Sequence, residues 1–146
     1  MSFRICSAVL CFALAMVLVG CEGSWEASTY PAMGSISING QIPEGAVVEL
    51  RSVGDAPDVR DSRPWGLVDA SGNYTLTTYK QNDGAPVGEY AVTVRWPPTI
   101  SKPSLEDKLN GAYSDPNESK WKVSIAAEDN LLAKIEIKGA KLTARS

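Results

Sequence analysis

The sequence predicts an all-β protein: one seven-stranded, two-sheet β-sandwich with a single long loop before its sixth strand. Two observations lead to this prediction. Short stretches between residues 35 and 137 alternate apolar and polar side chains with a period of two, the pattern of half-buried strands. Turn-forming dipeptides and prolines separate these stretches, and no segment between them reads as a long helix. Short strands at this spacing favour two sheets packed face to face.

Each expected strand alternates apolar and polar residues and ends at a turn signal. The clearest one runs from Gly88 to Trp96, and Pro97 stops it because proline cannot donate to a strand ladder. The expected strands are 35–38, 46–52, 65–68, 74–79, 88–96, 121–125 and 135–137. The side chains expected to face the core are Ile36, Ile38, Val48, Leu50, Tyr74, Leu76, Tyr90, Val92, Val94, Val123, Ile125, Ile135 and Ile137.

Two polar segments carry specific expectations. Asp69–Asn73 is interpreted as a tight turn, with the Asp69 carboxylate bonding backbone amides and Gly72 in a left-handed conformation. The alternative is a calcium loop, but no acidic ligand follows at the spacing of an EF-hand. In the long loop, residues 99–118, we expect one helical turn at residues 104–109, with Ser104 as N-cap and Asp107 completing a capping box.

The N-terminus has the pattern of a secretory signal. Arg4 is the only charged residue before Cys21, and residues 5–19 are apolar but too few for an ordinary membrane-spanning helix. This stretch ends in Leu18-Val19-Gly20-Cys21, which resembles the lipobox of bacterial lipoproteins. The resemblance implies cleavage before Cys21 and lipid attachment to its sulfur. The alternative is an ordinary signal peptide that happens to contain a cysteine.

The expected organisation has four parts: a lipoprotein signal peptide (1–20), a lipidated Cys21 with a flexible tether (21–33), the β-sandwich domain (34–138) and a loose tail (139–146). Trp25 in the tether either rests at the level of the lipid headgroups or packs onto the domain. Glu22, rather than an aspartate, follows Cys21. In bacteria with two membranes this pattern resembles that of lipoproteins exported to the outer membrane, so we expect a lipid-anchored protein of the cell envelope.

Composition narrows the function classes. The chain has 14 Lys and Arg against 17 Asp and Glu; without Arg4 the mature balance is 13 − 17 = −4, which argues against nucleic acid as a partner. The sequence has no histidine, which removes Ser-His-Asp catalysis and the usual zinc sites. We therefore expect a protein that is not an enzyme and that has no cofactor and no metal.

Several turn and strand motifs resemble the carboxypeptidase regulatory-like domain family. They are Asp69-x-x-Gly72-x-Tyr74-x-Leu76, Gly88-x-Tyr90-x-Val92-x-Val94, the first-hairpin pattern Ile36-x-Ile38-x-Gly40 with Pro43-x-Gly45-Ala46-x-Val48, and Asp107-Lys108-Leu109-x-Gly111-x-Tyr113-x-Asp115-Pro116. The resemblance covers residues 34–138 and implies a transthyretin-like or Ig-like sandwich. For function it implies a structural or accessory module.

Candidate ligand-binding residues are few. Trp65 and Tyr113 lie at loop edges and are the expected surface aromatics, whereas Trp96 and Trp121 fall on the inward faces of their strands. The carboxylates Asp107, Asp115 and Glu118 lie close in sequence, and a glycosidase would need two opposed carboxylates. We interpret the three as solvated loop residues. We expect a non-catalytic structural or protein-binding module of the envelope; the alternative is a carbohydrate- or peptide-binding accessory domain.

Overall fold

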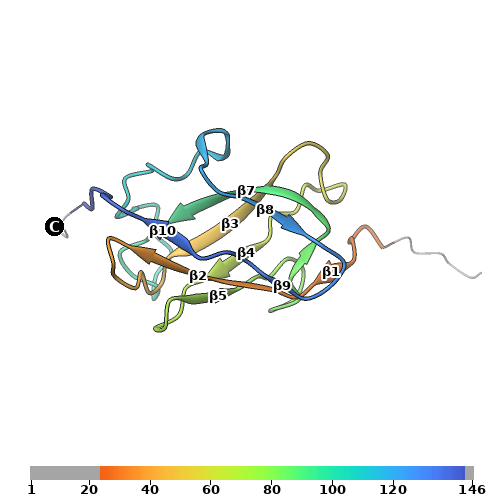
Figure 1. The fold of residues 1–146 in the computed structure, drawn as a ribbon, viewed down its shortest axis with the longest axis horizontal. Coiled ribbons are helices and arrows are strands. Elements are labelled where there is room, and N and C mark those ends of the chain that lie inside the picture. The colour runs from red at the N-terminus through yellow and green to blue at the C-terminus, as the bar shows by residue number, and fades with distance from the viewer. Residues whose placement is uncertain (1–23, 144–146) are drawn as a thin grey trace, which may run out of the picture.

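The computed structural model describes residues 24–143, and these form an all-β protein (Figure 1). Within this part of the chain we find one 3₁₀ turn, η1 (Pro116–Glu118), and no helix long and apolar enough to cross a membrane. The strands are β1 (Thr29–Tyr30), β2 (Ala32–Ile38), β3 (Val47–Ser52), β4 (Trp65–Leu67), β5 (Asn73–Thr75), β6 (Ala85–Pro86), β7 (Gly88–Arg95), β8 (Lys122–Ile125), β9 (Asn130–Leu131) and β10 (Ile135–Ile137).

Two four-stranded sheets make up most of the fold. One has the order β4-β3-β7-β8 and is antiparallel throughout. The other has the order β10-β2-β5. β9 pairs with the start of β2 and β10 with its end, both in parallel, and β5 runs antiparallel to β2. β1 and β6 form a separate two-stranded ribbon. The arrangement is consistent with a β-sandwich (Figure 1).

The core lies between the two sheets. Period-two alternation brings Val48 and Leu50 of β3 and Val92 and Val94 of β7 against residues of β2 and β10, and all of these are buried. Of the thirteen side chains expected to face inward, Val123 alone is only half-buried, because β8 is the end strand of its sheet. At about 1.5–3 kcal/mol for each large apolar side chain buried, this set is a major source of stability.

The structure has ten strands rather than seven, although each expected strand is present. The expected set corresponds to β2, β3, β4, β5, β7, β8 and β10, and the three additional strands have two residues each. Two-residue strands are too short to show a period of two. The strand expected at 74–79 ends at Thr75; beyond it, Thr77 pairs with Trp65 as an isolated bridge.

Both chain ends are more structured than a tether and a tail. Within the expected tether, Thr29–Tyr30 form β1, and Ala32, at the start of β2, is buried in the core. Near the other end, Asn39 binds Ala140 through both its side-chain oxygen (2.9 Å) and its side-chain nitrogen (2.8 Å). The Thr143 amide donates to the carbonyl oxygen of Lys108 (2.8 Å). The interpretation of both segments as loose was therefore wrong for these residues.

The turn at Asp69 was predicted correctly, and the helical turn after Ser104 was not. Asp69 Oδ1 accepts from the amides of Ser71 (2.8 Å) and Asn73 (3.0 Å), and Gly72 has φ of +83°. No helix forms at residues 104–109. Instead, Asp107 accepts from three backbone amides, those of Trp96 (2.8 Å), Leu109 (2.9 Å) and Gly111 (3.0 Å). A carboxylate that holds these amides cannot also bond the backbone of Ser104, as a capping box requires.

Candidate ligand-binding site

The two sides of the sandwich differ in how they are closed. On one side, the amides and carbonyls of Trp65 and Thr77 exchange two backbone hydrogen bonds (3.0 and 2.8 Å), which join β4 to the chain beyond β5; we call this the closed edge. On the other side the end strands are β8 and β10, which in the described chain pair only with β7 and β2. We call this side the open edge.

A loop at the open edge forms a pocket. The Val94 amide donates to the Tyr113 carbonyl (2.9 Å), and the Val92 amide donates to the Trp121 carbonyl (3.0 Å), so both ends of the loop are fixed to β7. Between them the chain projects outward through η1. Asp115 caps this turn by accepting from the Asn117 amide (2.9 Å).

The loop is braced from inside by one hydroxyl group. Ser119 Oγ lies within hydrogen-bond distance of the carbonyl oxygens of Val92 (2.6 Å) and Trp121 (2.9 Å), and it accepts from the Trp121 amide (3.2 Å). This contact holds the returning strand close to β7. The pocket is therefore positioned by backbone hydrogen bonds rather than by long flexible side chains.

Two aromatic rings form one wall of this pocket. The ring centroids of Tyr113 and Trp121 are 5.9 Å apart with an interplanar angle of 47°, and both side chains are half-buried against the core. The pocket has a volume of about 250 Å³. Its other lining side chains include Val92, Asp115, Glu118 and Lys120.

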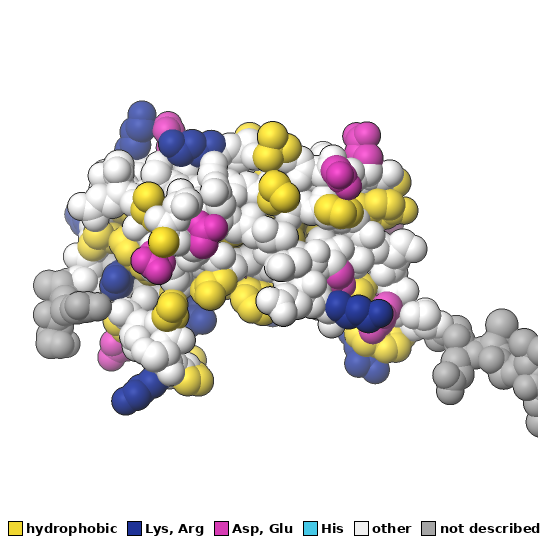
Figure 2. Space-filling model, turned by 90° about the horizontal axis from the view of Figure 1, so that it is seen from below, with side chains coloured by type: hydrophobic (Ala, Val, Ile, Leu, Met, Phe, Trp, Pro, Cys, Tyr) yellow, Lys and Arg dark blue, Asp and Glu magenta, His cyan; other side chains and the backbone are white. Residues whose placement is uncertain are grey.

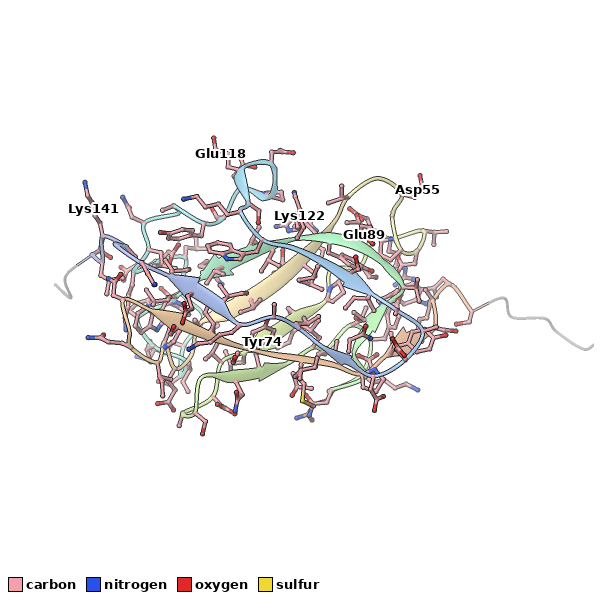
Figure 3. The ribbon with its side chains drawn as sticks, viewed as in Figure 1. Asp55, Tyr74, Glu89, Glu118, Lys122 and Lys141 are labelled. Carbon is pink, nitrogen blue, oxygen red and sulfur yellow. The ribbon has the colours of Figure 1, made fainter. Side chains whose placement is uncertain are left out.

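The polar groups of the pocket have opposite charges. Asp115 and Glu118 are carboxylates and hydrogen-bond acceptors, and Lys120 is a donor. In Figure 3, Glu118 stands at the outer rim of the loop, on the side away from the point where the N-terminal segment leaves the domain. An apolar wall facing a few polar groups suits a small ligand that has both a flat apolar face and hydrogen-bonding groups.

The structure separates the residues that sequence analysis selected as surface aromatics. Trp65 is 43% exposed and lies in β4 at the closed edge, while Tyr113 lies at the open edge, so the two do not share a platform. Trp96 is buried as expected, with its ring nitrogen donating to the Glu44 carbonyl (3.1 Å). Trp121, expected to lie in the core, instead pairs with Tyr113. Cys21 lies outside the described residues.

A larger hollow beside residues 95–114 is a poorer candidate. Its volume is about 520 Å³, and Arg95 and Asp107 are among its lining residues. The protein itself uses both side chains: Arg95 Nη1 donates to the Ser104 carbonyl (2.8 Å), and Asp107 holds three backbone amides. Asp107 therefore supports the backbone, whereas Asp115 and Glu118 line the smaller pocket. Among residues 24–143 no three His, Cys, Asp or Glu side chains are grouped so that they could hold a metal ion.

A second cluster attaches the N-terminal segment to the domain. Trp25 packs edge-on against Tyr79 (centroids 5.3 Å apart), and the Arg60 guanidinium lies 3.8 Å from the Trp25 ring centroid. The Tyr79 hydroxyl donates to Asp58 and accepts from the Ala27 amide (3.1 Å). We call Trp25, Asp58, Arg60 and Tyr79 the N-terminal clamp. For Trp25, the packing alternative is therefore the correct one.

The clamp perturbs the acidity of its members. Partial burial alone would raise the pKa of Asp58, but hydrogen bonds from the Ser62 and Tyr79 side chains and from the Arg60 and Ser62 amides outweigh it and lower the pKa to about 2. Burial, followed by the hydrogen bond to Asp58, raises the pKa of Tyr79. Asp58 is therefore ionised at neutral pH, the state in which it best accepts these hydrogen bonds.

One face of the domain has a mixed surface. Figure 2 shows acidic and basic side chains on this face, in places beside one another, with hydrophobic side chains between them. Comparisons with family models, with curated proteins and with solved structures give no match to this chain. The function must therefore be argued from the residues and their geometry.

Proposed function

We propose that this chain is a lipid-anchored protein of the cell envelope, attached through Cys21, whose domain is a non-catalytic structural or protein-binding module. We also propose that the domain belongs to the transthyretin-like sandwiches, since each of the seven strands that this resemblance implies has a counterpart in the structure. A carbohydrate- or peptide-binding accessory domain is the second candidate, and the pocket at Tyr113 and Trp121 favours it.

The observation that carries the anchor is the position of Cys21. It follows a short apolar stretch and Gly20, and it stands four residues (25 − 21) before Trp25, which packs onto the domain. One acyl chain holds a protein to a bilayer only marginally, so stable attachment needs the several chains of a lipoprotein. Glu22 at the next position supports the outer membrane as the destination.

The anchor is tested by the substitution Cys21→Ser. We expect the variant to leave the membrane fraction and to appear in the soluble fraction of the envelope, because the thioether can no longer form. Cys11→Ser is the matched control: it also removes one sulfur, but from within the apolar stretch, and should leave the mature protein attached. Retention of Cys21→Ser in membranes washed with high salt and alkaline carbonate would reject the lipid anchor.

A further inference from the structure

We propose that the pocket at the open edge binds a single neutral pyranose ring of a glycan. Trp121 and Tyr113 provide the apolar face against which the ring stacks, and Asp115, Glu118 and Lys120 bond its hydroxyl groups. The proposal rests on the second candidate function given above and names its ligand. It does not depend on the lipid anchor.

The size of the pocket favours one ring over a longer segment of polymer. Its volume of about 250 Å³ lies below the roughly 300–1,000 Å³ of pockets that enclose drug-sized ligands. The Tyr113 and Trp121 rings contact each other at an interplanar angle of 47°, so they form one bent wall and do not sandwich a ligand between parallel faces. A flat ligand therefore stacks against one side only, as the apolar face of a sugar ring does.

The charges of the pocket favour a neutral ligand. An anion would meet Asp115 and Glu118, and a cation would meet Lys120. A hydroxyl group both donates and accepts, so a sugar ring can satisfy carboxylate oxygens and the ammonium group at once. Mixed polar groups around an aromatic wall thus match a hydroxyl-rich neutral ring better than they match a charged side chain.

The position of the pocket gives a polymer access to it. The loop that carries Glu118 projects from the side of β7 and β8, whereas the N-terminal segment leaves from the end of the sandwich (Figures 1 and 3). The two residues of the pocket wall, Tyr113 and Trp121, are each fixed to β7 by a backbone hydrogen bond. A glycan chain can therefore pass the mouth of the pocket and place one unit inside it without any movement of the core.

The test is calorimetric titration of the purified full-length chain in a detergent without sugar headgroups. The probes are four tetrasaccharides: N-acetylglucosamine and glucose tetramers, which are neutral, a glucosamine tetramer, which is cationic, and a galacturonate tetramer, which is anionic. We expect a neutral tetramer to bind and the charged ones to bind more weakly. Failure of both neutral tetramers to bind, or tighter binding of a charged one, overturns the proposal.

Variants locate the site. Trp121→Ala should weaken binding of the neutral tetramer at least about tenfold, which corresponds to about 1.4 kcal/mol, because it removes the central aromatic contact. Glu118→Arg replaces an exposed side chain at the rim, which keeps the test valid if Trp121→Ala unfolds, and it should also weaken binding. Trp65→Ala is the control at the closed edge and should leave affinity within about twofold.

The variants also separate this proposal from its competitors. Weakening by Trp65→Ala, or no weakening by Glu118→Arg, would place the sugar elsewhere and overturn the assignment. Tetrasaccharides that stay inert while a synthetic extended peptide binds and protects the β8 amides from hydrogen exchange would assign the open edge to a peptide instead. A neutral tetramer that also binds the Cys21→Ser chain would support the pocket whatever the fractionation of that variant shows about the anchor, so the two failures can be told apart.

Discussion

The closed and open edges of the sandwich do the same structural job by different means. At the closed edge, Trp65 and Thr77 join the sheets through two backbone hydrogen bonds. At the open edge, side chains fill the gap: Tyr113, Trp121 and Val123 are half-buried there, and Ala140 packs against the core nearby. Backbone hydrogen bonds thus link the sheets at the closed edge, whereas side chains close the open edge and line a pocket there.

This difference shows why the candidate site lies where it does. Trp65 is a large exposed aromatic residue, but its backbone pairs with Thr77 on one side and with β3 on the other. Tyr113 and Trp121 lie where β7 extends beyond β8 and the partner strand is replaced by a loop. Loops carried on a rigid scaffold are common places for binding residues. An exposed aromatic side chain alone is thus less informative than one in a loop that replaces a strand at the edge of a sheet.

The largest expected effect comes from breaking the closed edge. Thr77→Pro removes the amide that donates to the Trp65 carbonyl and leaves that carbonyl without its donor, so we expect a loss of up to about 3 kcal/mol in the free energy of unfolding. Thr77→Ala, which keeps that amide, controls for the hydroxyl that accepts from the Asn82 amide (2.9 Å). Urea denaturation measures both variants.

The matched substitution at the open edge is Lys122→Pro. Because the Val92 amide donates to the Trp121 carbonyl, the next pair, Ala91 and Lys122, occupies a non-hydrogen-bonded position of the ladder, and the Lys122 amide points away from β7. Proline is tolerated on edge strands where the lost amide faces solvent. We expect a clearly smaller loss of stability than for Thr77→Pro. Equal losses would show that backbone hydrogen bonds do not stabilise the closed edge more than the open edge.

A smaller effect distinguishes two buried tyrosines. The Tyr90 hydroxyl donates to the Pro86 carbonyl (2.9 Å), whereas the Tyr74 hydroxyl has no hydrogen-bond partner among the described residues. Burial raises the pKa of each to about 12. Tyr90→Phe should cost about 1 kcal/mol, while Tyr74→Phe, next to the closed edge, should leave stability unchanged or raise it by up to about 1 kcal/mol. Thermal unfolding of the two variants decides this, and an equal loss in both would contradict it.

The smallest expected effect concerns the N-terminal clamp, which belongs to neither edge. The folded pKa of Asp58 is about 2, below its ordinary value of 3.8, so its stabilising contribution is complete above pH 4 and is lost as the pH falls through 2. The stability difference between the wild type and Asp58→Asn should therefore shrink between pH 4 and pH 2. Asp55→Asn, an exposed carboxylate in the same loop, is the control. A difference that does not change with pH would show that the Asp58 carboxylate does not stabilise the folded state in this way.

Local sequence pattern was enough to predict the strands but not their neighbours. Period-two alternation located every strand of three residues or more, because each buries one face. It could not reveal β1, β6 and β9, which are too short to alternate. It also placed Trp121 in the core: the alternation is correct, but β8 is an end strand, and that is a property of the topology and not of the local sequence.

The clamp was missed for a related reason. The Ala27 amide and the Tyr79 hydroxyl are 52 residues apart in the chain, and Asp58 and Tyr79 are 21 apart. No spacing rule connects residues at such separations. Asp69, in contrast, bonds amides two and four residues ahead, so its role was readable from five consecutive residues. Contacts within a turn are predictable from sequence, and contacts that fix a chain end to a distant loop are not.

The clamp has a consequence for how far the domain stands from a bilayer. If Cys21 carries lipid as proposed, only four residues (25 − 21) separate the lipid from Trp25 of the clamp, and four residues span at most about 14 Å. A flexible linker from Cys21 to Met33, as expected from the sequence, would instead have an r.m.s. end-to-end distance of about 20 Å. The short connection keeps the clamped end of the domain close to the lipid, so the domain would search for ligands in a thin layer beside the bilayer.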